Sequence, residues 1–326
     1  MNLNSRRVVA GGLAYSSYKF IKEYVDNTGT EPSGLYFNKA LSFLNTNLKR
    51  DGIELGLPHC WYRWGDQVVR YYMPRELKWT HEEDAYTKVE WNGNLPEYPN
   101  ASIKARIDSI VKQVTETYCR AGKIQDLVDR IYDEAPFEFQ RKYKQVRDFF
   151  HVASTTRTMD EKGKREVILS TVKNALESIP DDEIFKTVRD FAPTFLDLMN
   201  YCITSSEIGL GALNEISEEF WFWACYYLRL HPKAHENIGS DTVMFWNERL
   251  TEENAKFLDN FRDHVLEFSK FIPSIATDKN LRIYLDEAIE EDRQFRAMLS
   301  EFEKAVSDLG DFLGRNKKRY KFGEIN

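Results

Sequence analysis

The segment EEFWFWACYYLRL (Glu218 to Leu230) constrains the fold more than any other, because a helix with this sequence is apolar almost all round. Such a helix has no face that can point to water, so other elements must cover it on every side. We therefore expect it to form the central core helix of a bundle. A permanent interface between subunits and a contact with a membrane are the alternatives.

The rest of the C-terminal half has the apolar spacing that is typical of helices. Helices are predicted at about residues 164–178, 181–203, 217–230, 240–249, 251–271 and 278–314. The acidic run from Asp181 to Glu183 is expected in a first helical turn, where it favours the helix dipole. The last helix is partly heptad-like, which suggests a bundle spine or a partner-binding helix. Its apolar positions are Leu281, Leu285, Ile289, Phe295, Leu299, Phe302, Val306, Leu309 and Leu313.

The N-terminal half is predicted to hold helices and a small mixed region. Helical spacing occurs at about residues 8–25, 37–50, 100–118, 124–131 and 137–150. Glycine and proline break residues 53–74 into loops and short strands, and residues 86–91 predict another strand. The polar stretch from Ala153 to Lys164 is the best domain boundary.

The fold class predicted from these patterns is mainly α. Residues 1–152 would form an N-terminal helical domain that contains the small mixed α/β region. Residues 164–326 would form a C-terminal helical bundle domain with a long final helix.

Charge separates the same two halves. Residues 1–150 contain 22 Lys and Arg against 20 Asp and Glu, a net charge of +2, whereas residues 151–326 contain 23 against 32, a net charge of −9. Neither half has the broad basic excess of a domain dedicated to binding duplex DNA. A basic block occurs only near the C-terminus, as a solvated tail or as a contact for nucleic acid or phosphate. Its residues are Arg315, Lys317, Lys318, Arg319 and Lys321.

Several classes of protein are disfavoured by what the sequence lacks. It has no apolar run long enough for a membrane span and no secretion signal, so we expect a cytoplasmic protein without membrane contact. The four cysteines lie far apart, as reduced thiols do, and suggest no metal site. A phosphate-binding loop, a dinucleotide fingerprint and a nucleophile elbow are also missing, and no cofactor is expected.

The segment HCWYRWGDQVV (His59 to Val69) concentrates aromatic and charged residues around Gly65. Gly65 permits a tight turn, and Arg63 can stack on a neighbouring ring. One interpretation is a folded turn that buried aromatic rings hold in place. Another is a partner-binding surface, since Trp, Tyr and Arg dominate interface anchors, and a base-stacking platform is a third. The candidate partner-binding residues are Trp61, Tyr62, Arg63, Trp64, Arg70 and Tyr72.

Three segments in order resemble the Panacea antitoxin family, a prokaryotic helical domain. They are FNKALSFLNTNL (Phe37 to Leu48), HCWYRWGDQVV (His59 to Val69) and IDSIVKQVTETYCRAGKIQDLVDRIYDEAPF (Ile107 to Phe137). The sequence has Gly65-Asp66 where the family has Gly-Pro, and Phe137 where the family has Trp. The resemblance covers about 100 residues. It implies a winged-helix-like, non-enzymatic domain that neutralises or delivers a partner protein by direct binding.

The segment RLHPKAH (Arg229 to His235) gives a candidate catalytic pair. Arg229, five residues and His235 match the loose spacing used by HEPN ribonucleases, in which such a pair activates the ribose hydroxyl and stabilises the phosphate. That family favours a polar residue after the arginine, and Leu230 stands there. A surface arginine followed by a loop is the alternative interpretation.

We therefore expect a non-enzymatic prokaryotic component that binds another protein, of the antitoxin, adaptor or anti-phage defence type. One alternative is a HEPN-like ribonuclease effector that uses Arg229 and His235. Another is a winged-helix DNA-binding regulator, which the charge of the N-terminal half makes less attractive. The sequence leaves open whether the chain forms a homo-oligomer.

Overall fold

The computed structural model describes most of the chain. The described residues are 3–28, 34–52, 57–63, 65–69, 75–81, 87–95, 98, 101–118, 124–155 and 160–319.

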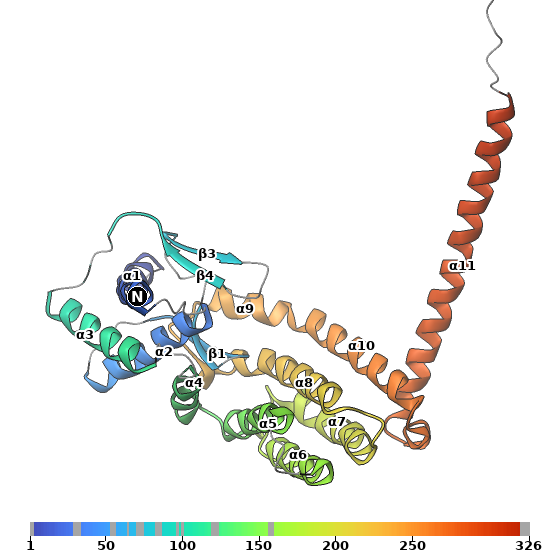
Figure 1. Cartoon of the computed structure of the whole chain (residues 1–326), viewed down its shortest axis with the longest axis horizontal. Coiled ribbons are helices and arrows are strands. Elements are labelled where there is room, and N and C mark those ends of the chain that lie inside the picture. Colours follow the sequence, from blue (N-terminus) through green and yellow to red (C-terminus); the bar gives the residue numbers. More distant parts are fainter. Residues whose placement is uncertain are drawn as a thin grey trace, which may run out of the picture.

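The N-terminal half contains helices α1 to α5 and two β-hairpins (Figure 1). The helices are α1 (Leu3–Thr28), α2 (Gly34–Arg50), α3 (Ala101–Tyr118), α4 (Ile124–Asp133) and α5 (Glu138–Thr155). The strands are β1 (His59–Tyr62), β2 (Gly65–Val68), β3 (Leu77–His81) and β4 (Thr87–Trp91).

The described residues of the C-terminal half are helical apart from one short strand and connecting turns. Its helices are α6 (Glu161–Leu176), α7 (Lys186–Thr204), α8 (Leu210–Leu230), α9 (Ser240–Glu248), α10 (Leu250–Ser269) and α11 (Arg282–Arg319). The strand is β5 (His235–Glu236).

The predicted fold class is confirmed, since the described chain is mainly α with small sheets. The expected strand at residues 86–91 is β4, and Gly52, which follows the end of α2, has a φ of +75°. The placement of the acids at 181–183 is wrong, because α7 begins only at Lys186. Asp182 instead accepts a hydrogen bond from the Phe185 amide at 3.1 Å in the turn before the helix.

Helix α8 is the central core helix that its sequence predicts. It is contacted by α5, α7 and α10 and by strand β1, and Phe220, Trp221 and Cys225 on it are fully buried. Rings from the neighbouring helices stack against it: Tyr143 of α5 lies 5.1 Å from Trp221, and Phe195 of α7 lies 4.2 Å from Phe220, between ring centroids. Burial of these large rings accounts for much of the aromatic content of the chain.

The two halves share a sheet and a core. Strand β1 pairs antiparallel with β2 on one side and with β5 of the C-terminal half on the other, with His59 opposite Glu236. Helices α5 and α6, on either side of the predicted boundary at residues 153–163, also contact each other. The division into two domains stays a prediction, and these contacts show that the two halves pack together.

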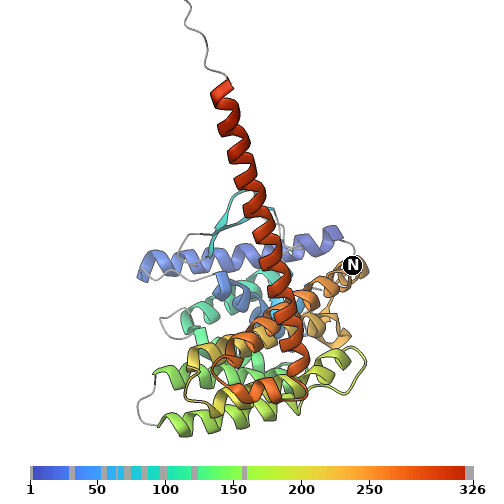
Figure 2. The ribbon, with the colours of Figure 1, turned by 90° about the vertical axis from the view of Figure 1, so that its right-hand side faces the viewer.

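Helix α11 differs from the other helices, because most of its length extends away from the body (Figures 1 and 2). Its first turns pack on α10, and the remainder continues beyond the bundle. Among the described helices, none is both long enough and apolar enough to cross a membrane.

Replacement of Trp221 tests whether α8 holds the core together. Trp221→Ala removes a buried ring and the hydrogen bond from Trp221 Nε1 to the Arg63 carbonyl oxygen at 2.8 Å. We expect the free energy of unfolding in urea to fall by about 3–5 kcal/mol. Trp221→Phe keeps most of the packing and should lose clearly less. Equal losses in the two variants would contradict the packing role.

Candidate functional site

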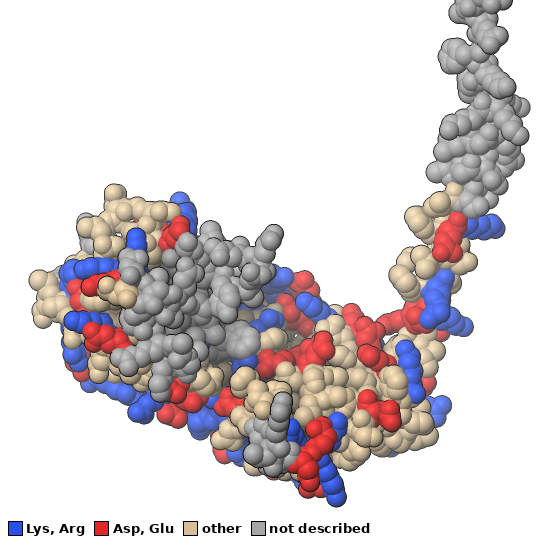
Figure 3. Space-filling view, in the orientation of Figure 1, with Lys and Arg blue, Asp and Glu red and all other residues tan. Residues whose placement is uncertain are grey.

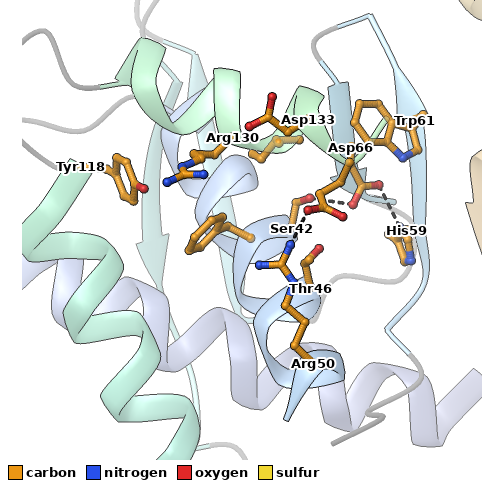
Figure 4. A pocket seen from close by; sticks show the side chains of 12 residues that line it. Ser42, Thr46, Arg50, His59, Trp61, Asp66, Tyr118, Arg130 and Asp133 are labelled. Atoms are coloured by element: carbon orange, nitrogen blue, oxygen red, sulfur yellow. Dashed lines mark hydrogen bonds and ion pairs between the residues drawn. The ribbon is translucent and has the colours of Figure 1, made fainter. Parts of the chain in front are cut away.

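A polar network joins strand β1, strand β2 and helix α2 (Figure 4). The buried carboxylate of Asp66 accepts hydrogen bonds from Ser42 Oγ at 2.6 Å and from His59 Nδ1 at 2.8 Å. The Asp66 carbonyl oxygen accepts another, at 3.0 Å, from Lys39 Nζ. The second ring nitrogen of His59 lies 3.1 Å from Glu236 Oε2 on β5. The network therefore ties the β1–β2 hairpin to α2 and to the C-terminal half.

The turn before Asp66 explains this placement. Gly65 has a φ of +91°, which glycine adopts at little cost, so the tight turn predicted there is confirmed. A Cβ atom at this position would lie 3.0 Å from the ring of Tyr132 and 3.1 Å from Lys39 Nζ. The turn can thus press against α2 and α4, and it directs Asp66 inward.

The charges of the network are set by burial and by their close pairing. Burial lowers the pKa of His59, but Asp66 and Glu236 on its two ring nitrogens outweigh burial and raise that pKa to about 9. Burial works to raise the Asp66 pKa, and the His59 ring with the Ser42 hydroxyl holds it below its usual value instead. Burial lowers the pKa of Lys39 to about 7 despite the nearby Asp66. At neutral pH, His59 is therefore an imidazolium between two carboxylates.

This arrangement is poorly suited to nucleophilic catalysis. The Ser42 hydroxyl donates to Asp66 rather than to His59, and a protonated imidazole cannot accept its proton. A surface pocket of about 390 Å³ opens beside the network (Figure 4). The side chains that line the pocket carry charges of both signs, and two of them, Arg50 and Glu134, form an ion pair. The pocket is lined by Ser42, Phe43, Thr46, Arg50, His59, Trp61, Asp66, Tyr118, Arg130, Ile131, Asp133 and Glu134.

The aromatic turn singled out from the sequence packs against α8. Trp61 is 6% exposed and contacts Tyr132 edge-on, so it belongs to the core. Tyr62 is partly buried against Tyr226 of α8, and the guanidinium of Arg63 donates to Tyr226 Oη at 3.0 Å. These contacts support a folded turn that buried rings hold in place. Trp64, Arg70 and Tyr72 lie outside the described residues.

The two residues of the proposed catalytic pair, Arg229 and His235, share a neighbour, Trp246. Arg229 lies over the rings of Tyr62, Tyr226 and Trp246, with centroid distances of 5.0, 4.4 and 5.3 Å, and burial lowers its pKa. His235 is part of β5, and its ring contacts Trp246 edge-on at 6.3 Å. Both side chains thus pack against Trp246. Both side chains are partly exposed, and their described contacts are packing contacts with aromatic rings.

Other candidates from the sequence are placed in part. The backbone of Arg315, Lys317, Lys318 and Arg319 continues helix α11, and Lys321 lies outside the described residues. Cys60, Cys202 and Cys225 are free and buried. Within the described ranges, no three His, Cys, Asp or Glu side chains are grouped closely enough to hold a metal ion.

The last helix carries an apolar surface that is exposed to solvent. Phe295, Leu299, Phe302 and Val306 are 58%, 45%, 65% and 53% exposed and recur at the spacing of a coiled-coil seam. We call these four residues the α11 stripe. Contiguous exposed apolar surface of this kind marks sites of interaction.

The sequence pointed to α11 but not to the Asp66 network. His59 and Asp66 stand seven residues apart, and only the hairpin register brings their side chains together. Lys39 and Ser42 follow the apolar positions of α2 and resemble ordinary solvent-facing residues in the sequence. The one signal of the network in the sequence was Asp66, a charged residue that directly follows the turn residue Gly65.

Comparisons of the sequence with protein-family models and with curated proteins, and of the structure with solved structures, found no match.

The protonation of His59 can be tested directly. The ring should titrate at about pH 9, and Asp66→Asn should lower its pKa by about 1 or more, because one of two facing charges is lost. Titration of the ring by NMR measures both values. A wild-type ring that titrates near 6.5 would contradict the paired arrangement.

Titration is more direct here than unfolding at varied pH. The raised pKa of His59 stabilises the fold below pH 6.5, and that contribution is lost as the pH rises through about 9. The lowered pKa of Lys39 acts in the opposite sense between about pH 7 and 10.5. The two effects on the free energy of unfolding oppose each other between about pH 7 and 9. A measurement of stability against pH would therefore not separate the contribution of His59 from that of Lys39.

Proposed function

We propose that the chain is a non-enzymatic, cytoplasmic prokaryotic component that acts by binding protein directly. The observation that carries this proposal is the α11 stripe. Four large apolar side chains lie on a helix that extends away from the body, and each is about half exposed or more. Full burial of such a side chain contributes about 1.5–3 kcal/mol. A protein partner that covers the stripe would therefore gain binding free energy from each of the four side chains.

The helix itself supports an interaction role. A helix in a folded protein gains most of its stability from the packing of an apolar face, and the outer part of α11 has no such packing within the described chain. Ion pairs along the helix, such as Arg293 with Glu290 and Arg296 with Asp292, contribute only about 0.2–0.5 kcal/mol each. A partner on the stripe would supply the stabilisation that these pairs cannot.

The type of component is proposed from the N-terminal half. The resemblance of residues 37–137 to the Panacea family supports an antitoxin, an adaptor or an anti-phage defence subunit. In this proposal the bundle positions α11, and the aromatic turn contributes to the fold and not to the interface.

The alternative functions have less support. Arg229 and His235 make packing contacts that a ribonuclease pair would have to break. A DNA-binding regulator needs a basic surface, and residues 1–150 have a net charge of only +2.

Site-specific photo-crosslinking in the native host tests the proposal. A photoreactive amino acid at Phe302 should form adducts with a polypeptide, because the stripe would be covered in the cell. The adducts are separated by mass and identified by mass spectrometry. They would consist either of two copies of this chain or of this chain with a different protein.

Lys304 provides the matched control, since it is exposed two residues further along α11, on the opposite face of the helix. A photoreactive group at Lys304 should give few adducts. The absence of protein adducts at Phe302, or equal yields at the two positions, would overturn the proposed function.

A further inference from the structure

We infer that the protein seated on the α11 stripe is a second copy of this chain, and that the two α11 helices pair antiparallel. This inference rests on the proposed function, because it names the occupant of the same surface. It is carried by the continuity of the apolar repeat, by the distribution of charge along α11 and by one pair of charged residues beside the stripe.

The stripe continues a heptad seam that begins inside the body. Leu281, Leu285 and Ala288 are 0%, 6% and 3% exposed, and the same two heptad positions recur in the stripe at Phe295 and Leu299. Asp292 occupies the seam between the two parts, where α11 leaves the bundle, and pairs with Arg296 at 2.8 Å. The seam packs against α10 at its base, and no described part of the chain covers it from Phe295 to Val306.

The charge of α11 changes sign along its length. Residues 282–292 carry five acidic residues and one basic residue, whereas residues 315–319 carry four basic residues and none that is acidic. Figure 3 shows acidic side chains where α11 leaves the body. Two parallel copies would place acid beside acid and base beside base. Two antiparallel copies would bring the basic tip of each helix towards the exposed acidic side chains at the base of the other, outside the part of the seam that α10 covers, and their helix dipoles would also be opposed.

The seam fixes a register for the antiparallel pair. Leu299 would face Phe302 of the second copy, and Phe295 would face Val306 of the second copy, as the two seam positions do in antiparallel coiled coils. In that register Arg296 lies beside Glu303 of the second copy, on the edge of the seam. Two-fold symmetry repeats this ion pair, so the interface contains it twice. In a parallel pair, by contrast, Arg296 and Glu303 would not meet.

The mass of the full chain in solution is the first test. Multi-angle light scattering and sedimentation should show a dimer, and Leu299→Glu with Phe302→Glu should give a monomer with an unchanged melting temperature. Ala297→Glu with Ser300→Glu adds the same charge to the outer face of α11 and should stay dimeric. A wild-type monomer at every concentration, or a stripe variant that stays dimeric, would overturn the inference.

A charge exchange tests the orientation. Arg296→Glu or Glu303→Arg alone should raise the dimer Kd about tenfold, since each disrupts two symmetric pairs. The double variant should recover most of the wild-type Kd, because it restores both pairs only in the antiparallel arrangement. No recovery in the double variant would overturn the antiparallel pairing.

A photoreactive group at Leu309 gives an independent measure of orientation. The antiparallel register predicts adducts with peptides around Asp292 of the second copy, whereas parallel helices would crosslink at residue 309 of both copies and overturn the inference.

Failure of this inference is distinguishable from failure of the proposed function. If Phe302 crosslinks in the host only to a different polypeptide, the second copy is excluded and the proposed function stands.

Discussion

Helix α8 has no polar face between Phe220 and Leu228, and the arrangement of the other elements follows from the need to cover it. Helices α5, α7 and α10 cover three sides, and strand β1 reaches it from the N-terminal half. The bond from Trp221 to the Arg63 carbonyl oxygen satisfies the indole N–H inside this core. One helix therefore links the two halves, which explains how segments of opposite net charge share a single packed interior.

The polar network at Asp66 is a second link between the halves, made with charge in place of apolar surface. A buried carboxylate is tolerated because Ser42 and His59 donate hydrogen bonds to the Asp66 carboxylate, while Lys39 donates to the Asp66 carbonyl oxygen. The same pairing keeps His59 protonated, which removes it from the set of general bases. Serine, histidine and aspartate often act together in catalysis. Here Ser42, His59 and Asp66 are better explained by their role in holding β1, β2, α2 and β5 together.

Most of the fold could be predicted from the sequence, because helical periodicity and glycine placement are local signals. The core position of α8 and the turn at Gly65 are examples. The pairing of β1 with β5 could not be predicted, since it joins residues about 175 positions apart through a two-residue strand. The polar network was missed for the same reason. The residue type of Trp61 suggested an interface anchor, whereas its place on strand β1 buries its side chain against Tyr132.

The exposed seam of α11 is where local pattern and tertiary structure disagree, and we interpret that disagreement as an interface. Its heptad spacing was visible in the sequence, but only the structure shows that the seam is covered at its base and exposed from Phe295 to Val306. Hydrogen–deuterium exchange of the purified full chain, followed over residues 293–306 at increasing protein concentration, tests the central claim most directly. Pairing with a second copy predicts that these amides become more protected as the concentration rises. Fast exchange that does not change with concentration would contradict it.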